Sequence, residues 1–226
     1  MAELLSEPEL DFYPSSDGEP MAETPIHVHA IMMLHQALED FFKGRPDVFI
    51  ASDIFWYWKI GSKTARISPD VMVVPGVERR DIYERRSFFS WIEGAIPAAV
   101  FEMASRRTWR KDLGKKYETY EKLGVKEYFL FDPEFQYLEA PLVGFRLRGK
   151  KYQEIPAKNM ESHLGFRLRT DGWMIRLIDS QTNESIPTRA EAVEQAKANT
   201  NEEKHRADAL ADEVERLKKQ LGRSGS

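Results

Sequence analysis

The chain has 226 residues, 42% hydrophobic and 31% charged, which is enough for one hydrophobic core plus an appendage and inconsistent with global disorder. The absence of cysteine excludes a disulfide framework, thiolate zinc sites and a cysteine nucleophile, and fits a reducing cytosol. A formal net charge of -4 argues against a surface coated with basic residues for wrapping nucleic acid, although a local basic patch remains compatible with it.

Residues 1–22 combine acidic side chains with Pro and Ser and show little periodicity, so they predict a loosely ordered lead-in. They lack the basic and apolar pattern of a signal peptide. No run in the chain approaches the roughly 20 apolar residues that span a bilayer. We therefore expect a cytoplasmic protein with no membrane partner.

The first predicted helix begins at Thr24, whose hydroxyl would cap it, with Pro25 at the first helical position. Its apolar side chains recur at helical spacing until Gly44, at Ile31, Leu34, Leu38 and Phe41. Two strands follow, over residues 48–58 and 67–74, and we expect them to form a hairpin around a polar turn.

The middle of the chain predicts a third strand, a helix and a fourth strand. Residues 96–103 form an apolar run typical of a buried strand. Residues 111–123 have helical spacing and end at Gly124, and residues 127–131 form a short aromatic strand. The order to this point is α-β-β-β-α-β. From residue 134 to about residue 185, alternating segments with Gly-containing turns predict antiparallel strands.

The last segment predicts a coiled-coil helix. It is rich in Ala, Glu and Lys and keeps one a/d register, interrupted at Thr200 and Glu203. The apolar positions of that register are Val193, Ala196, Ala207, Leu210, Val214, Leu217 and Leu221. Since the helix is highly charged elsewhere, we expect it to pair with a second copy as a dimer or with another partner; a solitary frayed helix is the alternative. The predicted organisation is an acidic segment (1–22), a domain (23–187), and a coiled-coil helix with a flexible end (188–226).

Three ionisable residues contradict their apolar surroundings. Asp70 follows a proline at the entry to an apolar strand, where a turn carboxylate is the alternative interpretation. Glu102 interrupts an apolar strand, and a carboxylate there is costly unless it is paired or metal-bound, so a buried salt bridge is its alternative. Lys116 lies on the apolar stripe of the second helix with Leu113 and Tyr120, where its stem could instead cover apolar surface.

Together these three residues describe a site for phosphodiester hydrolysis. Two carboxylates on adjacent strands supply hard oxygen ligands for Mg²⁺ or Mn²⁺, and the lysine can orient a water or stabilise charge on a pentavalent phosphate. Burial would lower the pKa of Lys116 and two neighbouring carboxylates would raise it, and the sequence leaves this balance open.

A basic stretch with one acid, Asp112, lies beside this site in the sequence. It could hold a phosphate backbone, or it could be a solvated loop and helix start. Its cations are Arg106, Arg107, Arg110, Lys111 and Lys115.

These motifs resemble the PD-(D/E)XK nuclease superfamily and, more closely, the Uma-two family of restriction-endonuclease-like proteins. The matching stretches are residues 23–27, 68–74, 101–105 and 112–117, followed by Tyr120, Gly124-Val125, Glu127-Tyr128 and Asp132-Pro133. The resemblance covers about residues 20–180. It implies a restriction-endonuclease-like α/β core, with a mixed central sheet flanked by helices, extra antiparallel strands and a C-terminal coiled-coil helix.

The same resemblance implies a metal-dependent endonuclease that cleaves DNA. Asp70 and Glu102 would bind Mg²⁺ or Mn²⁺, and Lys116 would position the nucleophile. Glu23 and His27 match the helix entry of the family and could supplement the metal shell with Asp112, although a satisfied core histidine is the stronger interpretation of His27.

One position departs from the superfamily pattern. The lysine expected two residues after the second acid is replaced by Ala104, and in Uma-type proteins it is displaced to the helix, which corresponds to Lys116. If that displacement does not hold, the site lacks its lysine. The alternative function is a catalytically inactive nuclease-fold module for binding or scaffolding that dimerises through its C-terminal helix.

Overall fold

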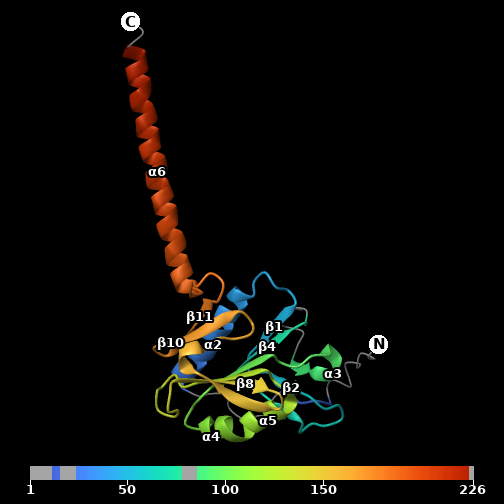
Figure 1. Cartoon of the computed structure of the whole chain (residues 1–226). Coiled ribbons are helices and arrows are strands. Elements are labelled where there is room, and N and C mark those ends of the chain that lie inside the picture. Colours follow the sequence, from blue (N-terminus) through green and yellow to red (C-terminus); the bar gives the residue numbers. More distant parts are fainter. Residues whose placement is uncertain (1–11, 16–23, 78–85, 224–226) are drawn as a thin grey trace. The chain divides into compact units, whose positions relative to one another are not determined.

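The computed structural model describes residues 12–15, 24–77 and 86–223 (Figure 1). The candidate residue Glu23 and the predicted segment 1–22, except for residues 12–15, lie outside this part of the chain. The chain divides into two compact units, Met1–Ile186 and Pro187–Ser226.

A six-stranded mixed sheet forms the centre of the first unit (Figure 1). Only β6 and β7 pair in parallel, among the strands of this sheet. Parallel neighbours need a crossover, which here is the helical segment between them. In spatial order the strands are β1 (Val48–Ala51), β4 (Val71–Pro75), β6 (Ala99–Met103), β7 (Glu127–Phe131), β8 (Leu142–Arg148) and β9 (Lys151–Ile155).

Helices cover the two faces of this sheet (Figure 1). On one face, α2 (Pro25–Phe41) begins after the predicted N-cap Thr24. The Thr24 hydroxyl does not cap this helix, contrary to the prediction, because it donates instead to Glu134 Oε1 at 2.8 Å. The segment on the other face consists of α4 (Trp109–Lys111), a π-helix (Asp112–Lys116) and α5 (Tyr117–Leu123).

Alternation along β6 decides which side chains face which helix. Phe101 and Met103 belong to the apolar cluster that includes α2. Val100 belongs to the opposite cluster, together with Tyr120 of α5. Glu102 shares the face of Val100, so the second helical segment, rather than α2, supplies its partners.

The predicted strand over residues 48–58 divides in two, because Asp53 adopts a left-handed backbone conformation with φ 52°. β1 pairs with β4, as the predicted hairpin requires, but an arm is inserted between them. This arm forms a second sheet with β5, a strand that follows β4 in the chain; in it, β2 pairs antiparallel with β3 and parallel with β5. The strands of this second sheet are β2 (Phe55–Tyr57), β3 (Arg66–Ile67) and β5 (Ser87–Phe89).

The predicted fold class is confirmed. The elements α2, β1, β4, β6, α5 and β7 follow each other in the predicted α-β-β-β-α-β order, with the β2–β3 arm and short elements inserted. The extra antiparallel strands are β8 with β9, and β10 (Phe166–Asp171) with β11 (Met174–Asp179), of which β11 packs on α2. Two further short helices are α3 (Ser90–Glu93) and the 3₁₀-helix Ala157–Asn159.

In the second unit, a long helix, α6 (Arg189–Arg223), occupies most of the residues. Several of its predicted a/d side chains are about half exposed: Val193, Leu210, Val214 and Leu217. Pairing of this helix with a second copy stays a prediction. Among the helices of the described ranges, none has the length and apolarity needed to traverse a bilayer.

Candidate active site

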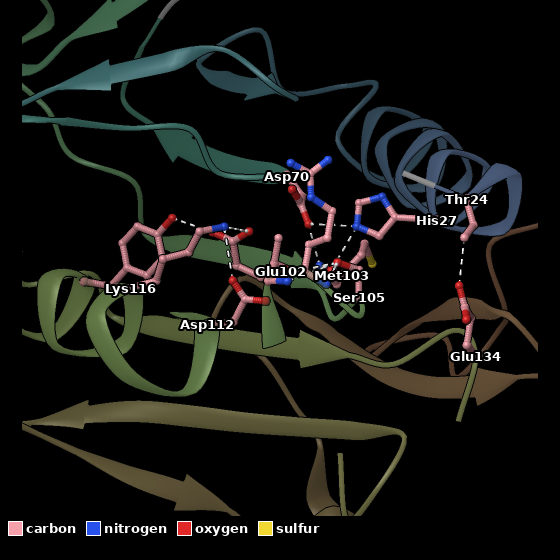
Figure 2. A network of polar contacts seen from close by, with 12 residues as sticks. Thr24, His27, Asp70, Glu102, Met103, Ser105, Asp112, Lys116 and Glu134 are labelled. Carbon is pink, nitrogen blue, oxygen red and sulfur yellow. Dashed lines mark hydrogen bonds and ion pairs between the residues drawn. The ribbon is translucent and has the colours of Figure 1, made fainter. Parts of the chain in front are cut away.

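The antiparallel pairing of β4 with β6 brings Asp70 and Glu102 to the same end of the sheet. Val71 lies opposite Phe101, so Asp70, one residue before Val71, comes next to the end of β6. The main-chain N–H of Met103 donates to Asp70 Oδ2 at 2.6 Å. Two acids that are 32 positions apart in the chain therefore lie on neighbouring strands beside each other (Figure 2).

Glu102 is fully buried and both of its carboxylate oxygens have donors. Lys116 Nζ donates to Oε2 at 2.6 Å, and the Tyr120 hydroxyl donates to Oε1 at 2.6 Å. Figure 2 shows the Lys116 side chain directed at Glu102. The structure therefore brings together the glutamate and the lysine that the sequence singled out.

A π-helical turn decides which residues of the helical segment face the sheet. Lys116 Nζ also lies 3.2 Å from Oδ1 of Asp112, which is fully buried. Leu113, which the helical stripe placed on the inner face, is 41% exposed. The wider π-turn shifts the helix phase, so Asp112, Lys116 and Tyr120 share the inner face instead.

Burial raises the pKa values of the acids in this cluster. It raises the pKa of Asp70 and of Glu102 to about 7, and that of Asp112 to about 6, although Lys116 opposes each shift. Burial lowers the pKa of Lys116, but the charges of the three acids outweigh it and raise the pKa above its ordinary value. Of the two opposing effects that the sequence left open, the attraction to the carboxylates is the larger, and it favours the protonated form of Lys116.

His27 lies at the edge of the cluster as a satisfied core histidine. Its side chain is buried, and Nε2 lies 2.9 Å from the main-chain oxygen of Met103 and 3.7 Å from Asp70 Oδ2. A carbonyl oxygen can only accept, so Nε2 carries the proton and donates. A nitrogen that donates to a carbonyl is not free to bind a metal, which makes His27 a support for β6.

Two members of the cluster escaped the sequence reasoning. Tyr120 was placed on the apolar stripe and among the positions that match the family, but it was given no role in the site, although its hydroxyl donates to Glu102. Asp53 was not selected at all, yet its N–H donates to Pro69 O at 3.2 Å and its charge raises the pKa of Asp70. An isolated acid in a turn between two strands carries no sequence signal that separates it from an ordinary loop residue.

The predicted basic stretch directly follows the end of β6 and faces solvent. Ser105 begins it, with its hydroxyl accepting the N–H groups of Arg107 and Thr108 at 3.3 Å. The Arg110 guanidinium lies 4.3 Å from the centre of the Trp109 ring. All of the candidate phosphate-binding cations are exposed: Arg106, Arg107, Arg110 and Lys111.

The donor set fits a hard divalent cation in charge and in chemistry. Asp70, Glu102 and Asp112 are opposed by one ammonium, Lys116, so an additional cation would relieve their repulsion. Among the residues that the structure describes, no three His, Asp or Glu side chains converge as a ready-made ligand group. Mg²⁺ commonly takes one or two carboxylates and keeps several waters, so Asp70 and Glu102 with solvent would suffice.

Comparison with known proteins gives matches of two kinds, to a family model and to solved structures. A family model described as "Uma2: Putative restriction endonuclease" matches residues 3–173. Among solved structures, the chain is similar to "a putative nuclease belonging to DUF820 from Anabaena variabilis ATCC 29413", with 14% sequence identity and a TM-score of 0.45, over 76% of this chain and 86% of that chain. No curated protein matched the chain.

Proposed function

The chain belongs to the Uma2 family, described as "Putative restriction endonuclease", and we propose from this premise that it is an endonuclease that hydrolyses DNA phosphodiester bonds with a divalent metal ion. The observation that carries the proposal is the contact of 2.6 Å between Lys116 Nζ and Glu102, beside Asp70 on the neighbouring strand. An acid pair and an ammonium from three separate elements meet at one end of the sheet. That grouping supplies both cation ligands and a fixed positive charge.

In this proposal Asp70 and Glu102 hold Mg²⁺ or Mn²⁺. When bound, such a cation supplies Lewis-acid activation of water and counters charge on the scissile phosphate. Tyr120 fixes one oxygen of Glu102 and so orients the carboxylate.

Lys116 acts as a proton donor in hydrogen bonds rather than as a base, because the surrounding acids keep it protonated. An ammonium has three N–H donors. Glu102 accepts one of them, and Asp112 lies beside Nζ as an ion-pair partner. The side chain is 19% exposed, so a remaining N–H can orient the attacking water or a phosphate oxygen.

The substrate backbone is held, in this proposal, by the exposed cations after β6. They begin four residues beyond Glu102, so phosphates bound there lie close to the carboxylates. Backbone contacts position a duplex without reading its sequence. The proposed phosphate-binding residues are Arg106, Arg107, Arg110 and Lys111.

Cleavage of supercoiled plasmid with Mg²⁺ or Mn²⁺ tests the proposal. We expect nicking by the wild type, and its loss in Asp70→Asn and in Lys116→Met. The matched controls are Asp40→Asn and Lys122→Met, which change exposed residues of α2 and α5 and should cleave like the wild type. A wild type that nicks no form of DNA, or an Asp70→Asn variant that keeps the full rate, would contradict the proposal.

The alternative is an inactive nuclease-fold scaffold, and one observation favours it. The position of the superfamily lysine is Ala104, which is 1% exposed and leaves no cation on β6. Metal titration separates the two functions. For a nuclease, we expect Mn²⁺ to raise the unfolding temperature of the wild type but not of Glu102→Gln, whereas a scaffold should respond to Mn²⁺ in neither protein.

We also propose that α6 joins two copies of the chain. Its exposed apolar side chains lie on one a/d seam, and burying that seam against another helix removes them from water. A dimer would present two copies of the candidate active site.

A further inference from the structure

The segment between β1 and β4 leaves and rejoins the central sheet at the candidate active site. This segment, residues 54–68, is here named the β2–β3 arm. Asp53 immediately precedes the arm and Asp70 follows it by two residues. The Asp53 N–H donates to Pro69 O at 3.2 Å, which closes the base of the arm. The base of the arm therefore lies directly beside Asp70, one of the two proposed cation-binding acids.

The root of the arm packs on the residue that orients Glu102. Trp56 of β2 is fully buried, and its ring lies parallel to that of Tyr120, with centroids 6.2 Å apart and an interplanar angle of 1°. Its indole N–H donates to Ser90 Oγ at 2.7 Å. Figure 1 shows β2 beside α5, which carries Tyr120. These contacts fix the direction in which the arm leaves the site.

The tip of the arm is held in one shape by polar contacts. Gly61 has φ 73° and donates its N–H to the Tyr13 hydroxyl at 2.7 Å. Below the tip, Trp58 N–H donates to Ala65 O at 3.3 Å. Ser62 Oγ accepts the Ala65 N–H at 3.2 Å. A tip that is already ordered loses little conformational entropy on binding.

The tip carries positive charge and one prominent apolar side chain. Ile60 is 61% exposed, the highest exposed fraction among the large hydrophobic residues of the described chain. Lys59 and Lys63 flank it, and both are exposed. No ion pair joins either lysine to an acid within the described ranges. Residues 54–68 contain three cations and no acid, in a chain whose net charge is -4.

We propose that the β2–β3 arm binds the DNA duplex beside the cleavage site. Lys59 and Lys63 bind backbone phosphates, and Ile60 presses against sugars and base edges in the minor groove. This inference rests on the proposed nuclease function.

The length of the arm sets where on the duplex it binds. Seven positions separate Asp53 from Ile60, so the tip lies within about 23 Å of the base of the arm at ~3.3 Å per residue. That distance corresponds to roughly seven base steps of the duplex at ~3.4 Å each.

DNA binding in EDTA, where no cleavage occurs, tests the arm separately from catalysis. The full chain is titrated into a fluorescein-labelled duplex of about 30 base pairs, at salt concentrations from about 50 to 200 mM, and anisotropy is measured. The variants are Lys59→Gln with Lys63→Gln, and Ile60→Ser. A matched control is Lys150→Gln with Lys158→Gln, an exposed lysine pair elsewhere on the surface. Thermal unfolding establishes that all proteins are folded.

The expected results separate charge from apolar contact. The plot of log K against log salt falls with a slope of about −0.9 for each phosphate contact. The double lysine variant loses two contacts, so its slope should be less steep by about 1.8. Ile60→Ser should bind several-fold more weakly with an unchanged slope, and the control pair should bind like the wild type.

Two results would overturn the inference. One leaves the proposed nuclease function intact, and the other contradicts it as well. If the wild type binds the duplex and both arm variants bind it with the same affinity and slope, the arm has no part in binding while the nuclease proposal stands. If the wild type binds no duplex at all, the proposed function and the inference fall together.

Discussion

Replacing Asp70 by asparagine should stabilise the metal-free protein at alkaline pH. Asparagine keeps the shape of the side chain, and its oxygen can still accept the Met103 N–H that Asp70 accepts at 2.6 Å. It removes the negative charge of Asp70, whose side chain is only 14% exposed and whose charge is repelled by Asp112. Asparagine also loses the attraction of Asp70 to Lys116, but the pKa of Asp70 already includes that attraction, so it needs no separate correction.

The size of the effect follows from that pKa. Burial raises the pKa of Asp70 from an ordinary 3.8 to about 7, a difference of about 3, and each unit corresponds to ~1.4 kcal/mol. The folded state thus binds more protons than the unfolded state between about pH 4 and pH 7, so the free energy of unfolding falls as the pH rises through that range. The raised pKa of Asp70 therefore lowers the free energy of unfolding by about 4 kcal/mol at pH 8, where the folded carboxyl is ionised, and by about 2 kcal/mol at pH 5, where it takes up a proton on folding.

Urea unfolding in EDTA at these two pH values measures the effect. We expect Asp70→Asn to exceed the wild type in stability at both, by an amount that grows towards pH 8. The exposed Asp40→Asn serves as control and should show no such pH-dependent gain. Since asparagine is also a poorer cation ligand, added Mn²⁺ should stabilise the wild type and not Asp70→Asn. A gap between wild type and variant that stays constant or shrinks towards pH 8 would refute the charge argument.

Three further predictions concern Lys116, Tyr120 and the helix α6. Lys116→Met should destabilise the metal-free protein by about 3–5 kcal/mol at pH 8 and by less at pH 5, where the acids are protonated; urea unfolding with equal losses at both pH values would contradict this. Tyr120→Phe should cost about 1.5–3 kcal/mol in the same assay, because Glu102 Oε1 loses its donor; an unchanged stability would show that the hydroxyl contributes nothing. Ending the chain at residue 187 should leave the first unit folded and reduce the mass in solution from dimer to monomer by light scattering; equal monomeric masses for both chains would argue against pairing through α6.

Local sequence patterns predicted the main strands of the central sheet, but they did not predict where a strand breaks or which distant residue a side chain contacts. Periodicity identified the strands that became β4, β6 and β7, because each buries a continuous apolar run. It could not place a break at Asp53, since a positive φ at one aspartate leaves the apolar pattern unchanged. Nor could it show that the Thr24 hydroxyl binds Glu134, because capping rules consider only neighbours in sequence and these residues are 110 positions apart.

The candidate site was predictable where a charged residue interrupts an apolar pattern. Glu102 and Lys116 each do so, and they contact each other. Leu113, the predicted neighbour of Lys116 on the inner stripe, is instead exposed. A strict period of 3.6 residues cannot describe a π-turn, so the helical stripe did not place Asp112 on the inner face, where it is buried beside Lys116. The family resemblance alone named Asp112 as a supplementary site residue.

The position of the lysine also determines the charge of the site. A lysine at position 104 would extend from the residue that directly follows β6, and Ala104 there is buried with its N–H donating to Phe131 O. Lys116 instead reaches Glu102 from the helical segment and brings Asp112, one turn earlier, into the same cluster. The helical segment thus supplies both the ammonium and a third buried acid of the cluster. Burial first and then the neighbouring acids raise the pKa values of these carboxyls, and three acids beside one ammonium favour an additional divalent cation.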